Sequence, residues 1–591
     1  MRKHLTFIAL CALTLALCSC SGGSRVIKDG KLRYRIVRSA QALPAEITAA
    51  ERLSKYFELI TGNPVETVTD ETPAKGREIV LGLTGRDIPS VKAVRDTLGG
   101  EGYAILKKGK RIFVTGSCEN YGRGTLYGAF ELLRLMGCEF YATDTETVPS
   151  LNDLVLKKVN KVEKPAFEYR DVYWSAVWDK EISVKLHRNG NLAGQLPTEW
   201  GNGVFYAGQF VHTFSKLVPP EEYFEEHPEY FSEIDGVRTA RHLYSQLCVT
   251  NEDVFNITLA KVRQWLDENP DAKIVSVSQN DSFVIGSYCT CPECQAIIDE
   301  EGSPMGPLLR FVNRIADSVK VTRPDVAVDV LAYQYSITPP KHTVPRDNVI
   351  VRYCTGGCNG HSIEECPNNV HAREHIERWG QICDRIYIWD YTTNFAQYLC
   401  PFPNFYTLKD NINFFKNNGV KGVFEQGMYQ GGVSGEFGEM RAYVLARLLW
   451  NPDLDTDELI DGFMGAYYGA AAPKVREYFD YIHKVIADSG RHFTLVQNCA
   501  DIFDGLISDE DLARMDKIWE EAIEAAEGKD KAHTRAANLS WRFYKMMSRR
   551  GEWAPEESYA DEEKRFYHDC NELGVTKLRE GVNIPWIESL I

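Results

Sequence analysis

The chain lacks long apolar runs. After residue 17, no stretch approaches the roughly 20 apolar residues of a membrane-spanning helix. It also lacks an excess of basic residues, since 67 Lys and Arg stand against 83 Asp and Glu, which gives a net charge of −16. A nucleic-acid binder presents a basic surface, so the composition argues against that class. Internal repeats and low-complexity tracts are missing too, so a repeat architecture is not expected.

The first residues have the pattern of a bacterial export signal. Arg2 and Lys3 precede an apolar run that is too short for a stable membrane anchor but suits a signal-peptide core. Leu17-Cys18-Ser19-Cys20 then resembles a lipobox, in which Cys20 is lipidated and becomes the mature N-terminus. An ordinary secretory signal is the alternative. We therefore expect residues 1–20 to be a lipoprotein signal and the protein to be lipid-anchored at the outer membrane, the cell surface or the periplasm.

Length indicates several domains, because 591 residues exceed the roughly 100–200 of a typical domain. Residues 32–158 have the strand and helix pattern of a small α/β domain. Its Gly-rich helix start near Gly122 is not a phosphate loop, because no Gly-x-x-x-x-Gly-Lys-Ser/Thr pattern follows the strand. Residues 167–455 alternate apolar strands with helices, and residues 456–591 are predominantly helical.

Four apolar runs in the middle of the chain end in polar or ionisable clusters. These clusters are Ser278-Gln279-Asn280-Asp281, Tyr333-Gln334-Tyr335, Trp389-Asp390-Tyr391 and Glu425-Gln426-Gly427. Most of the runs follow a helix-like stretch, which is the layout of parallel strands. The pattern predicts an α/β fold with a (β/α)8 TIM-type barrel of eight strands, the third at 246–251. In such barrels the C-terminal strand ends meet at one mouth, where active sites lie.

Glu425 and Asp281 are the predicted catalytic carboxylates. Glu425 follows a strongly apolar strand, where burial would raise its pKa toward general-acid use; a buried salt bridge is the alternative. Asp281 could protonate a leaving oxygen or, together with Asn280, orient a substrate acetamide; a helix cap is the alternative. The sequence does not fix the distance between the two carboxyl groups. This distance is about 5 Å in retaining glycosidases and about 6.5–9.5 Å in inverting ones.

Aromatic side chains at the same strand ends suit sugar binding, because they offer flat apolar faces. Core packing would explain any one of them equally well. Asp390 could accept hydrogen bonds from sugar hydroxyls, and His212 is a possible contact from a neighbouring loop. The expected substrate-binding residues are Asn280, Asp390, Trp389, Tyr391, Tyr333, Tyr335 and His212. Carboxylates framed by Trp and Tyr indicate carbohydrate chemistry.

Cysteines gather in Cys289-Thr290-Cys291-Pro292-Glu293-Cys294, where three thiols could face a metal ion. Cys354, Cys358, His361 or Cys366 could complete a tetrahedral zinc site. A second Cys-x-x-Cys is lacking, and free thiols or disulfides beside the active site are the alternative. We expect no catalytic metal and no cofactor.

Together these motifs resemble glycoside hydrolase family 163, endo-β-N-acetylglucosaminidases that act on N-glycans. The resemblance is spread over most of residues 167–485 and is carried by 277–281, 289–294, 389–395, 401–404, 422–427, 448–453 and 467–469. It implies a surface enzyme that cleaves the GlcNAc-β-1,4-GlcNAc core of complex glycans or glycoproteins, with retention. The resemblance does not fix which carboxylate is the acid.

The N-terminal segment is similar to the small domain that precedes the barrel in β-hexosaminidases and α-glucuronidases. The similarity is carried by Ala49 to Tyr56 with Thr61-Gly62, and by Gly122 to Leu133 with Gly137 to Phe140. Two other classes stay open: an exo-acting glycosidase of the glucuronidase or hexosaminidase type, and a non-catalytic glycan-binding lipoprotein. A glucuronidase would need a basic group for the uronate carboxylate, and a binding protein would need no paired acids.

Overall fold

The computed structural model describes residues 23–192, 194, 196–241, 245–282, 284, 286–548 and 556–585. The signal peptide and Cys20, both predicted from the sequence, lie outside these described residues. The chain divides into two compact units. The first contains the chain up to Glu139 with Thr147–Lys164 and Thr198–Gly201, and the second contains the remainder. No helix within the described ranges is long and apolar enough to cross a membrane.

The first unit is built on a six-stranded mixed sheet, ordered β11-β6-β7-β5-β3-β4. Its strands are β3 (Arg35–Arg38), β4 (Thr67–Thr69), β5 (Glu78–Leu81), β6 (Tyr103–Lys108), β7 (Arg111–Gly116) and β11 (Lys161–Glu163). The neighbours among β3, β4, β5 and β7 pair in parallel, whereas β6 is antiparallel to β7 and β11. A smaller sheet joins β10 (Leu154–Leu156), β1 (Ser24–Lys28) and β2 (Lys31–Leu32).

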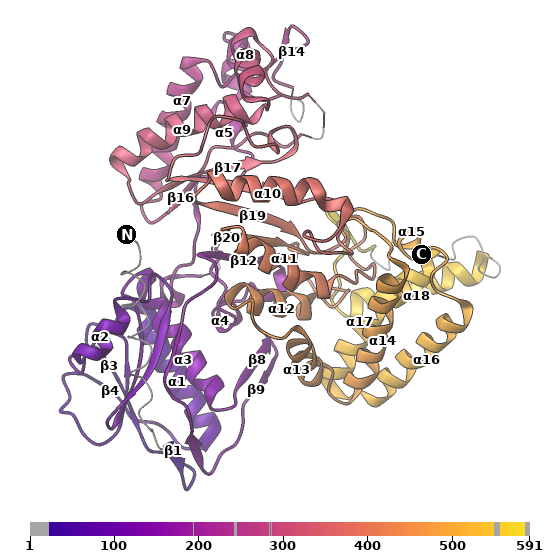
Figure 1. Ribbon diagram of the computed structural model, residues 1–591. Helices are drawn as coiled ribbons and strands as arrows, with labels where there is room; N and C mark the ends of the chain where they lie inside the picture. Colours follow the sequence, from indigo (N-terminus) through magenta and orange to yellow (C-terminus); the bar gives the residue numbers. More distant parts are fainter. Residues whose placement is uncertain are drawn as a thin grey trace, which may run out of the picture. The chain divides into compact units, whose positions relative to one another are not determined.

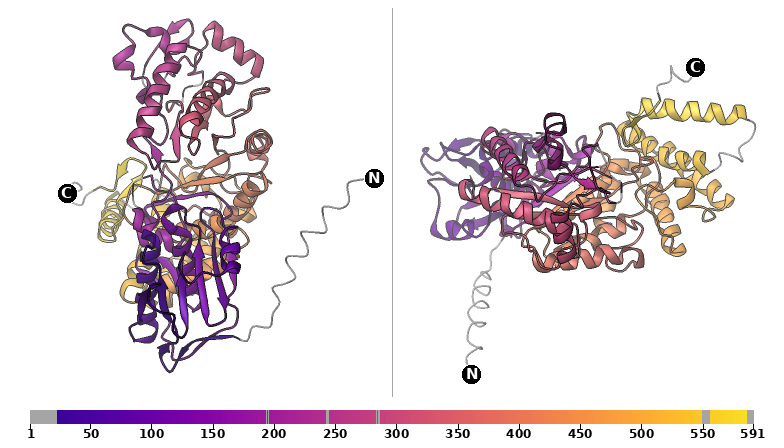
Figure 2. Two further views of the ribbon diagram at one scale, coloured as in Figure 1. Left: turned by 90° about the vertical axis from the view of Figure 1, so that its left-hand side faces the viewer. Right: turned by 90° about the horizontal axis from the view of Figure 1, so that it is seen from above.

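Two helices of this unit, α1 (Pro44–Thr61) and α3 (Arg123–Leu135), pack against each other beside the strands (Figure 2). A short third helix, α2 (Pro89–Arg95), completes the unit. Pro44 occupies the first turn of α1, where its missing N–H costs nothing. Gly62 ends that helix in the left-handed conformation, with φ 69°. The mixture of strands and helices predicted for residues 32–158 is present in this unit.

The second unit contains a seven-stranded sheet, ordered β12-β20-β19-β18-β17-β16-β13, in which every pair is parallel (Figure 1). The strands are β12 (Tyr169–Tyr173), β13 (Tyr206–Ala207), β16 (Ile274–Ser276), β17 (Ala327–Ala332), β18 (Val349–Cys354), β19 (Ile386–Tyr391) and β20 (Gly422–Gln426). The sheet curls into a TIM-like fold, with seven paired strands where the sequence predicted eight.

The place of the second barrel strand is taken by residues 189–191 alone. The Asn189 N–H donates to the Arg170 carbonyl of β12. The Val204 N–H donates to the Asn189 carbonyl, and the Asn191 N–H donates to the Val204 carbonyl. Hydrogen bonds therefore run from β12 through this segment toward β13.

Glycine is required in this narrow segment. A Cβ on Gly190 would overlap the carboxyl group of Asp171, which points across it. That carboxyl group accepts a 2.7 Å hydrogen bond from Arg188, and both side chains are fully buried. A side chain at position 190 would displace a buried ion pair, which is costly to break.

The third barrel strand is not residues 246–251, so this prediction was wrong. Tyr206–Ala207 form the third strand and pair with β16, whereas Leu247 makes only an isolated antiparallel bridge to Phe231. The apolar composition of 246–251 suggested a strand, and a strand of two residues is too short to show a pattern. A second departure is the β17–β18 connection, which contains the 3₁₀ turn Gln334–Ser336 and no α-helix.

Alternate strand residues fill the barrel interior. One buried cluster takes a side chain from each of the seven strands: Tyr169, Tyr206, Ile274, Ala327, Ile350, Tyr387 and Phe424. Arg352 lies among these rings and forms a fully buried ion pair with Asp329. The interior is therefore a packed core, as in TIM barrels generally. Residues one position along, such as Glu425 after Phe424, face the opposite side of the sheet.

Helices surround the sheet and continue beyond it (Figure 1). Those connecting or following strands are α4 (Lys180–Lys185), α5 (Phe214–Leu217), α6 (Pro220–Tyr223), α7 (Glu252–Glu268), α8 (Pro292–Glu301), α9 (Met305–Thr322), α10 (Val370–Ile382), α11 (Phe405–Asn417) and α12 (Gly438–Trp450). The later ones are α13 (Thr456–Tyr468), α14 (Ala472–Ser489), α15 (Cys499–Ile502), α16 (Asp509–Ala525), α17 (Gly528–Ser548) and α18 (Glu556–Glu572). The described part of residues 456–591 is predominantly helical, as predicted.

Candidate functional site

The C-terminal ends of the barrel strands form a mouth with an apolar floor. Val211, Leu331 and Cys354 make a buried cluster there, and the partly buried rings of Phe210, Tyr333 and Trp389 pack against it. Phe210 and Trp389 stack with ring centroids 5.5 Å apart. A cavity of about 330 Å³ adjoins Phe210. Because the rings of Phe210, Tyr333 and Trp389 are only partly buried, the mouth offers flat apolar surfaces that solvent reaches.

Asp281 lies at this mouth. Its half-buried carboxylate accepts a 3.4 Å hydrogen bond from the Tyr333 hydroxyl. Burial, and after it the negative charges of neighbours that include Asp281, raise the pKa of Tyr391 well above its usual value. Asp281, Tyr333 and Tyr391, all predicted from the sequence, are thus brought together. Trp389 joins them through Tyr391, with ring centroids 6.2 Å apart.

His212 borders the same mouth in a strained backbone conformation. Its φ is 56°, in the left-handed region that costs a non-glycine residue energy. The Ser278 hydroxyl accepts from its N–H at 2.9 Å, and its Nδ1 lies 2.9 Å from the Gln279 carbonyl oxygen. The His212 ring is 6.1 Å from that of Tyr333. The surrounding bonds therefore fix this imidazole beside the strand end that carries Asp281.

Two other predicted substrate contacts have structural partners. The Asn280 Oδ1 accepts from the Ser215 N–H at 2.9 Å, and its Nδ2 donates to the Ser245 carbonyl at 3.2 Å. Both ends of the amide are thus bonded to backbone. Tyr335 packs against Tyr288, with ring centroids 5.3 Å apart, next to Cys289 and Cys294. Neither side chain belongs to the cluster that contains the rings of Phe210, Tyr333 and Trp389.

Asp390 and Glu425 are neighbours on β19 and β20, on the face of the sheet opposite Trp389 and Phe424. Burial raises the pKa of Asp390 to about 6, although Thr355 donates a 2.6 Å hydrogen bond to its Oδ1. Burial, with the adjacent Asp390 charge, raises the pKa of Glu425 well above its usual value. The Glu425 Oε2 has no hydrogen-bond partner among the described residues.

The predicted carboxylate pair is therefore distributed over two places. Asp281 lies at the mouth, whereas Glu425 lies with Asp390 behind the wall of the mouth. Glu425 sits between Phe424 and Gln426, whose side chains face inward, so its own side chain points toward the helices. The catalytic role of Glu425 stays a prediction, but this placement gives it no direct exposure to a substrate in the mouth.

Sequence reasoning missed Phe210, Gln426 and Cys354 as parts of the site. Phe210 went unnoticed because β13, which precedes it, was not recognised. Gln426 accepts a 2.8 Å hydrogen bond from the Trp389 indole N–H, and so orients that ring. Gln426 could have been found from its position next to Glu425. Side chains of consecutive strand residues point to opposite faces of the sheet, so only one of these two can face the barrel interior.

Two groups of side chains have the composition of metal sites. Cys248, Cys289, Cys291 and Cys294 form the first, with their sulfur atoms all within 4.8 Å of one another. Cys358, His361, Cys366 and His492 form the second, by the same measure. The prediction that Cys354, Cys358, His361 or Cys366 completes the first cluster was wrong, because Cys248 completes it.

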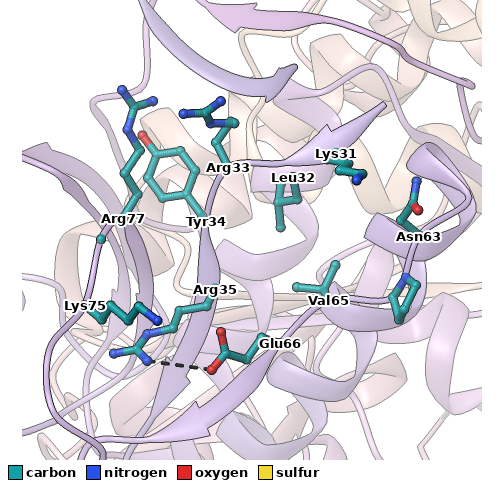
Figure 3. A pocket seen from close by; sticks show the side chains of 12 residues that line it. Lys31, Leu32, Arg33, Tyr34, Arg35, Asn63, Val65, Glu66, Lys75 and Arg77 are labelled. Carbon is teal, nitrogen blue, oxygen red and sulfur yellow. Dashed lines mark ion pairs between the residues drawn. The ribbon is translucent and has the colours of Figure 1, made fainter. Parts of the chain in front are cut away.

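A separate cavity of about 490 Å³ lies in the first unit (Figure 3). Basic side chains dominate its lining, and one of them, Arg35, forms a 3.7 Å ion pair with Glu66. Arg35 also donates a 2.8 Å hydrogen bond to the buried Glu78. None of the residues predicted to act on a substrate lies in this cavity.

Comparison with known proteins identifies a family over the barrel and the helices after it. Residues 140–480 match the family described as "Domain of unknown function (DUF4838)". The chain belongs to this family. No curated protein matches the chain. Membership in DUF4838 therefore comes without an assigned activity.

Among solved structures, the chain is similar to one described as "A novel family GH115 4-O-Methyl-alpha-glucuronidase, BtGH115A, with specificity for decorated arabinogalactans". The TM-score is 0.59 at 12% identity, over 91% of this chain and 76% of that chain. At this identity the likeness shows the fold alone. This DUF4838 chain thus has the fold of a glycoside hydrolase.

Proposed function

We propose that the protein is a glycoside hydrolase whose active site is the mouth of the barrel. The observation that carries the proposal is the Asp281 carboxylate, held at a barrel strand end by Tyr333, whose ring belongs to the same cluster as those of Trp389 and Phe210. A sugar ring stacked on such a surface would present its glycosidic oxygen to a carboxyl group, which is the arrangement that acid catalysis needs.

The specific reaction we propose is endo-acting cleavage of the GlcNAc-β-1,4-GlcNAc core of N-glycans, with retention. The support is the set of motifs that resemble those of glycoside hydrolase family 163, which includes the segment ending at Asp281. In this reaction the substrate's own acetamide oxygen attacks the anomeric carbon, and the protein supplies an acid for the leaving oxygen. Asp281 is the proposed acid. With Asn280 bonded to backbone, His212 is the polar group that borders Asp281.

An exo-acting glucuronidase is the second candidate, favoured by the solved structure that shares the fold. Such an enzyme needs a basic group for the uronate carboxylate. The described residues that we place at the mouth include no Lys or Arg, and Arg352 is committed below it to Asp329. The endo-acting reaction on an uncharged core is therefore preferred.

The assignment of Asp281 is tested by isosteric substitution. Asp281→Asn keeps the shape and removes the proton, so turnover on N-glycans should fall by about 10²–10⁴-fold, the usual value of acid–base assistance. The loss should be smaller on an aryl glycoside with an activated leaving group, which needs little protonation. Glu425→Gln is the paired variant and tests the predicted catalytic role of Glu425. It also replaces a carboxyl by an amide, but behind the wall of the mouth, so a smaller loss of turnover than in Asp281→Asn is expected.

Opposite results would reassign the acid. If Asp281→Asn is active and Glu425→Gln is not, Glu425 is the catalytic carboxylate. An equal loss on both substrates for Asp281→Asn would instead give Asp281 an orienting role. Circular dichroism of both variants should match that of the parent protein, so that a loss of turnover is not a loss of fold.

A further inference from the structure

Four cysteines of the second unit converge at the start of α8. Cys289 and Cys291 lie just before this helix, Cys294 lies in its first turn, and Cys248 comes from a loop some forty residues earlier. All four thiols are buried and none forms a disulfide. The sulfur atoms of Cys248 and Cys291 lie 3.7 Å apart. A disulfide would bring them to about 2.05 Å.

The spacing is that of a tetrahedral metal site. With Zn–S bonds of about 2.3 Å, the edge of a ZnS₄ tetrahedron is about 3.8 Å, close to the distance found. Donors surround the sulfur atoms, as around structural zinc. The Glu233 N–H and the Arg238 guanidinium approach Cys289 at 3.3 Å and 3.7 Å, and the Thr250 hydroxyl lies 3.3 Å from Cys294.

The second cluster has the same geometry with two imidazoles. The Cys358 sulfur lies 3.4 Å from the His361 Nδ1 and 3.3 Å from the His492 Nδ1. The Cys366 sulfur lies 3.5 Å from the same His492 nitrogen. Zn–S and Zn–N bonds of about 2.3 and 2.0 Å give an S···N edge of about 3.5 Å. Three ligands come from the loop after β18, and His492 comes from the chain after α14.

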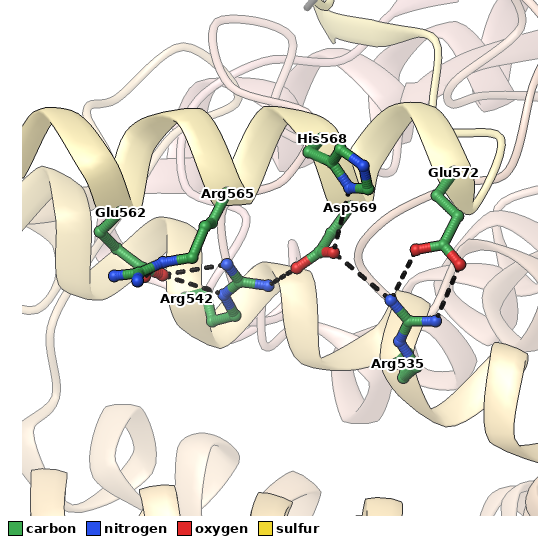
Figure 4. A network of polar contacts seen from close by, with 7 residues as sticks. All are labelled: Arg535, Arg542, Glu562, Arg565, His568, Asp569 and Glu572. Atoms are coloured by element: carbon green, nitrogen blue, oxygen red, sulfur yellow. Dashed lines mark hydrogen bonds and ion pairs between the residues drawn. The ribbon is translucent and has the colours of Figure 1, made fainter.

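A third group, His568, Asp569 and Glu572, contains no cysteine and differs from a tetrahedral zinc site (Figure 4). Its carboxylates already pair with arginines: Asp569 with Arg542, and Glu572 with Arg535 at 2.8 Å. These cations neutralise the charge that would attract a metal ion. Ligand identity and geometry therefore single out the two cysteine-containing clusters.

We propose that the protein binds two structural zinc ions, one at Cys248, Cys289, Cys291 and Cys294, the other at Cys358, His361, Cys366 and His492. Four protein ligands close each site and leave no open position for a substrate or an activated water, so neither ion is catalytic. This inference goes beyond the proposed function and does not depend on it.

Each zinc ion would brace a loop of the barrel mouth. Near the first site, Gln246 accepts a 2.7 Å hydrogen bond from the Asn280 N–H and donates one of 3.0 Å to the Asn280 carbonyl, next to Asp281. Near the second, the Asn359 amide donates a 3.0 Å hydrogen bond to the Tyr391 carbonyl. The ions would thus fix the two loops whose neighbours, Asp281 and Tyr391, meet at the mouth.

The test is the metal content of the full-length chain, purified without added zinc and measured by plasma mass spectrometry. We expect two zinc ions per chain in the parent protein and one in each of Cys291→Ser and Cys366→Ser. Cys383→Ser is the matched control, because Cys383 is a buried thiol outside both clusters, and it should keep two. Zinc content that does not fall in either cluster variant would overturn the proposal.

A second measurement covers the case in which the cluster variants do not fold. The parent protein is treated with a thiol-alkylating reagent before and after removal of metal by a chelator, and modified cysteines are mapped by peptide mass spectrometry. The six ligand cysteines should be protected by zinc and become reactive after chelation. Disulfides within either cluster, or unchanged reactivity after chelation, would contradict the proposal.

Discussion

Asp390 and Glu425 lie opposite each other on the neighbouring parallel strands β19 and β20, and burial raises the pKa of both carboxyl groups. Burial removes water from both carboxyl groups, and the Asp390 charge adds to the effect at Glu425, so each holds its proton more firmly than in the unfolded chain. Burial, followed by the charge of Asp390, raises the pKa of Glu425 well above its usual value. The protonation of these two carboxyl groups, which lie behind the wall of the mouth, therefore makes the stability of the fold depend on pH.

This pair predicts how stability changes with pH. The pKa of Asp390 is about 6 when folded and about 3.8 when unfolded, so the folded chain binds more protons between these values. Its contribution is complete below about pH 4 and is lost as pH rises through 6, at a cost on the order of 3 kcal/mol. Urea unfolding at pH 4.5 and pH 8 should show most of this decline, and Asp390→Asn should reduce it. An equal decline in the variant would assign it to other groups.

Trp389 is expected to act as a binding platform. Trp389→Ala removes the ring that stacks on Phe210, so KM should rise about tenfold while kcat changes little, because stacking favours ground state and transition state alike. Trp389→Phe is the control that keeps an aromatic face but loses the indole bond to Gln426. Its KM should lie between those of the parent and the alanine variant. A fall in kcat alone would place Trp389 in the chemical step instead.

Lipid anchoring at Cys20 remains a proposal that fractionation can test. Cys20→Ser should move the full-length protein out of the membrane fraction, because it removes the thiol that would carry the lipid. Retention of the variant in membranes would indicate that Cys18 or an uncleaved signal provides the anchor. Mass spectrometry of the N-terminal peptide identifies the lipidated residue directly.

Much of the fold could be predicted because strand and helix patterns are local. The strands from β16 to β20 and the late helices follow from apolar runs and turn residues, and those runs also placed Asp281 at the mouth. The face of the sheet on which the Glu425 side chain lies could not be predicted in the same way. Strands covered on both sides are apolar throughout, so Val423-Phe424-Glu425 carries no alternation to show which side chains point inward.

The prediction was also limited by contacts between residues that are far apart in the sequence. Three cysteines of the first cluster stand within six residues, but the fourth, Cys248, comes from a loop whose composition suggested a strand. His492 is still farther from Cys358 and has no local motif. Their convergence depends on the paths of β16 and β18 and the loops after them, which only the folded chain fixes.

The most direct test of the proposed glycosidase is incubation of the full-length protein with N-glycoproteins, followed by mass spectrometry of the released glycans and the remaining protein. The account predicts released glycans that end in a single GlcNAc, with the other GlcNAc left on asparagine, and release slowed by about 10²–10⁴-fold in Asp281→Asn. Absence of any released glycan from the parent protein, or equal release by Asp281→Asn, would contradict it.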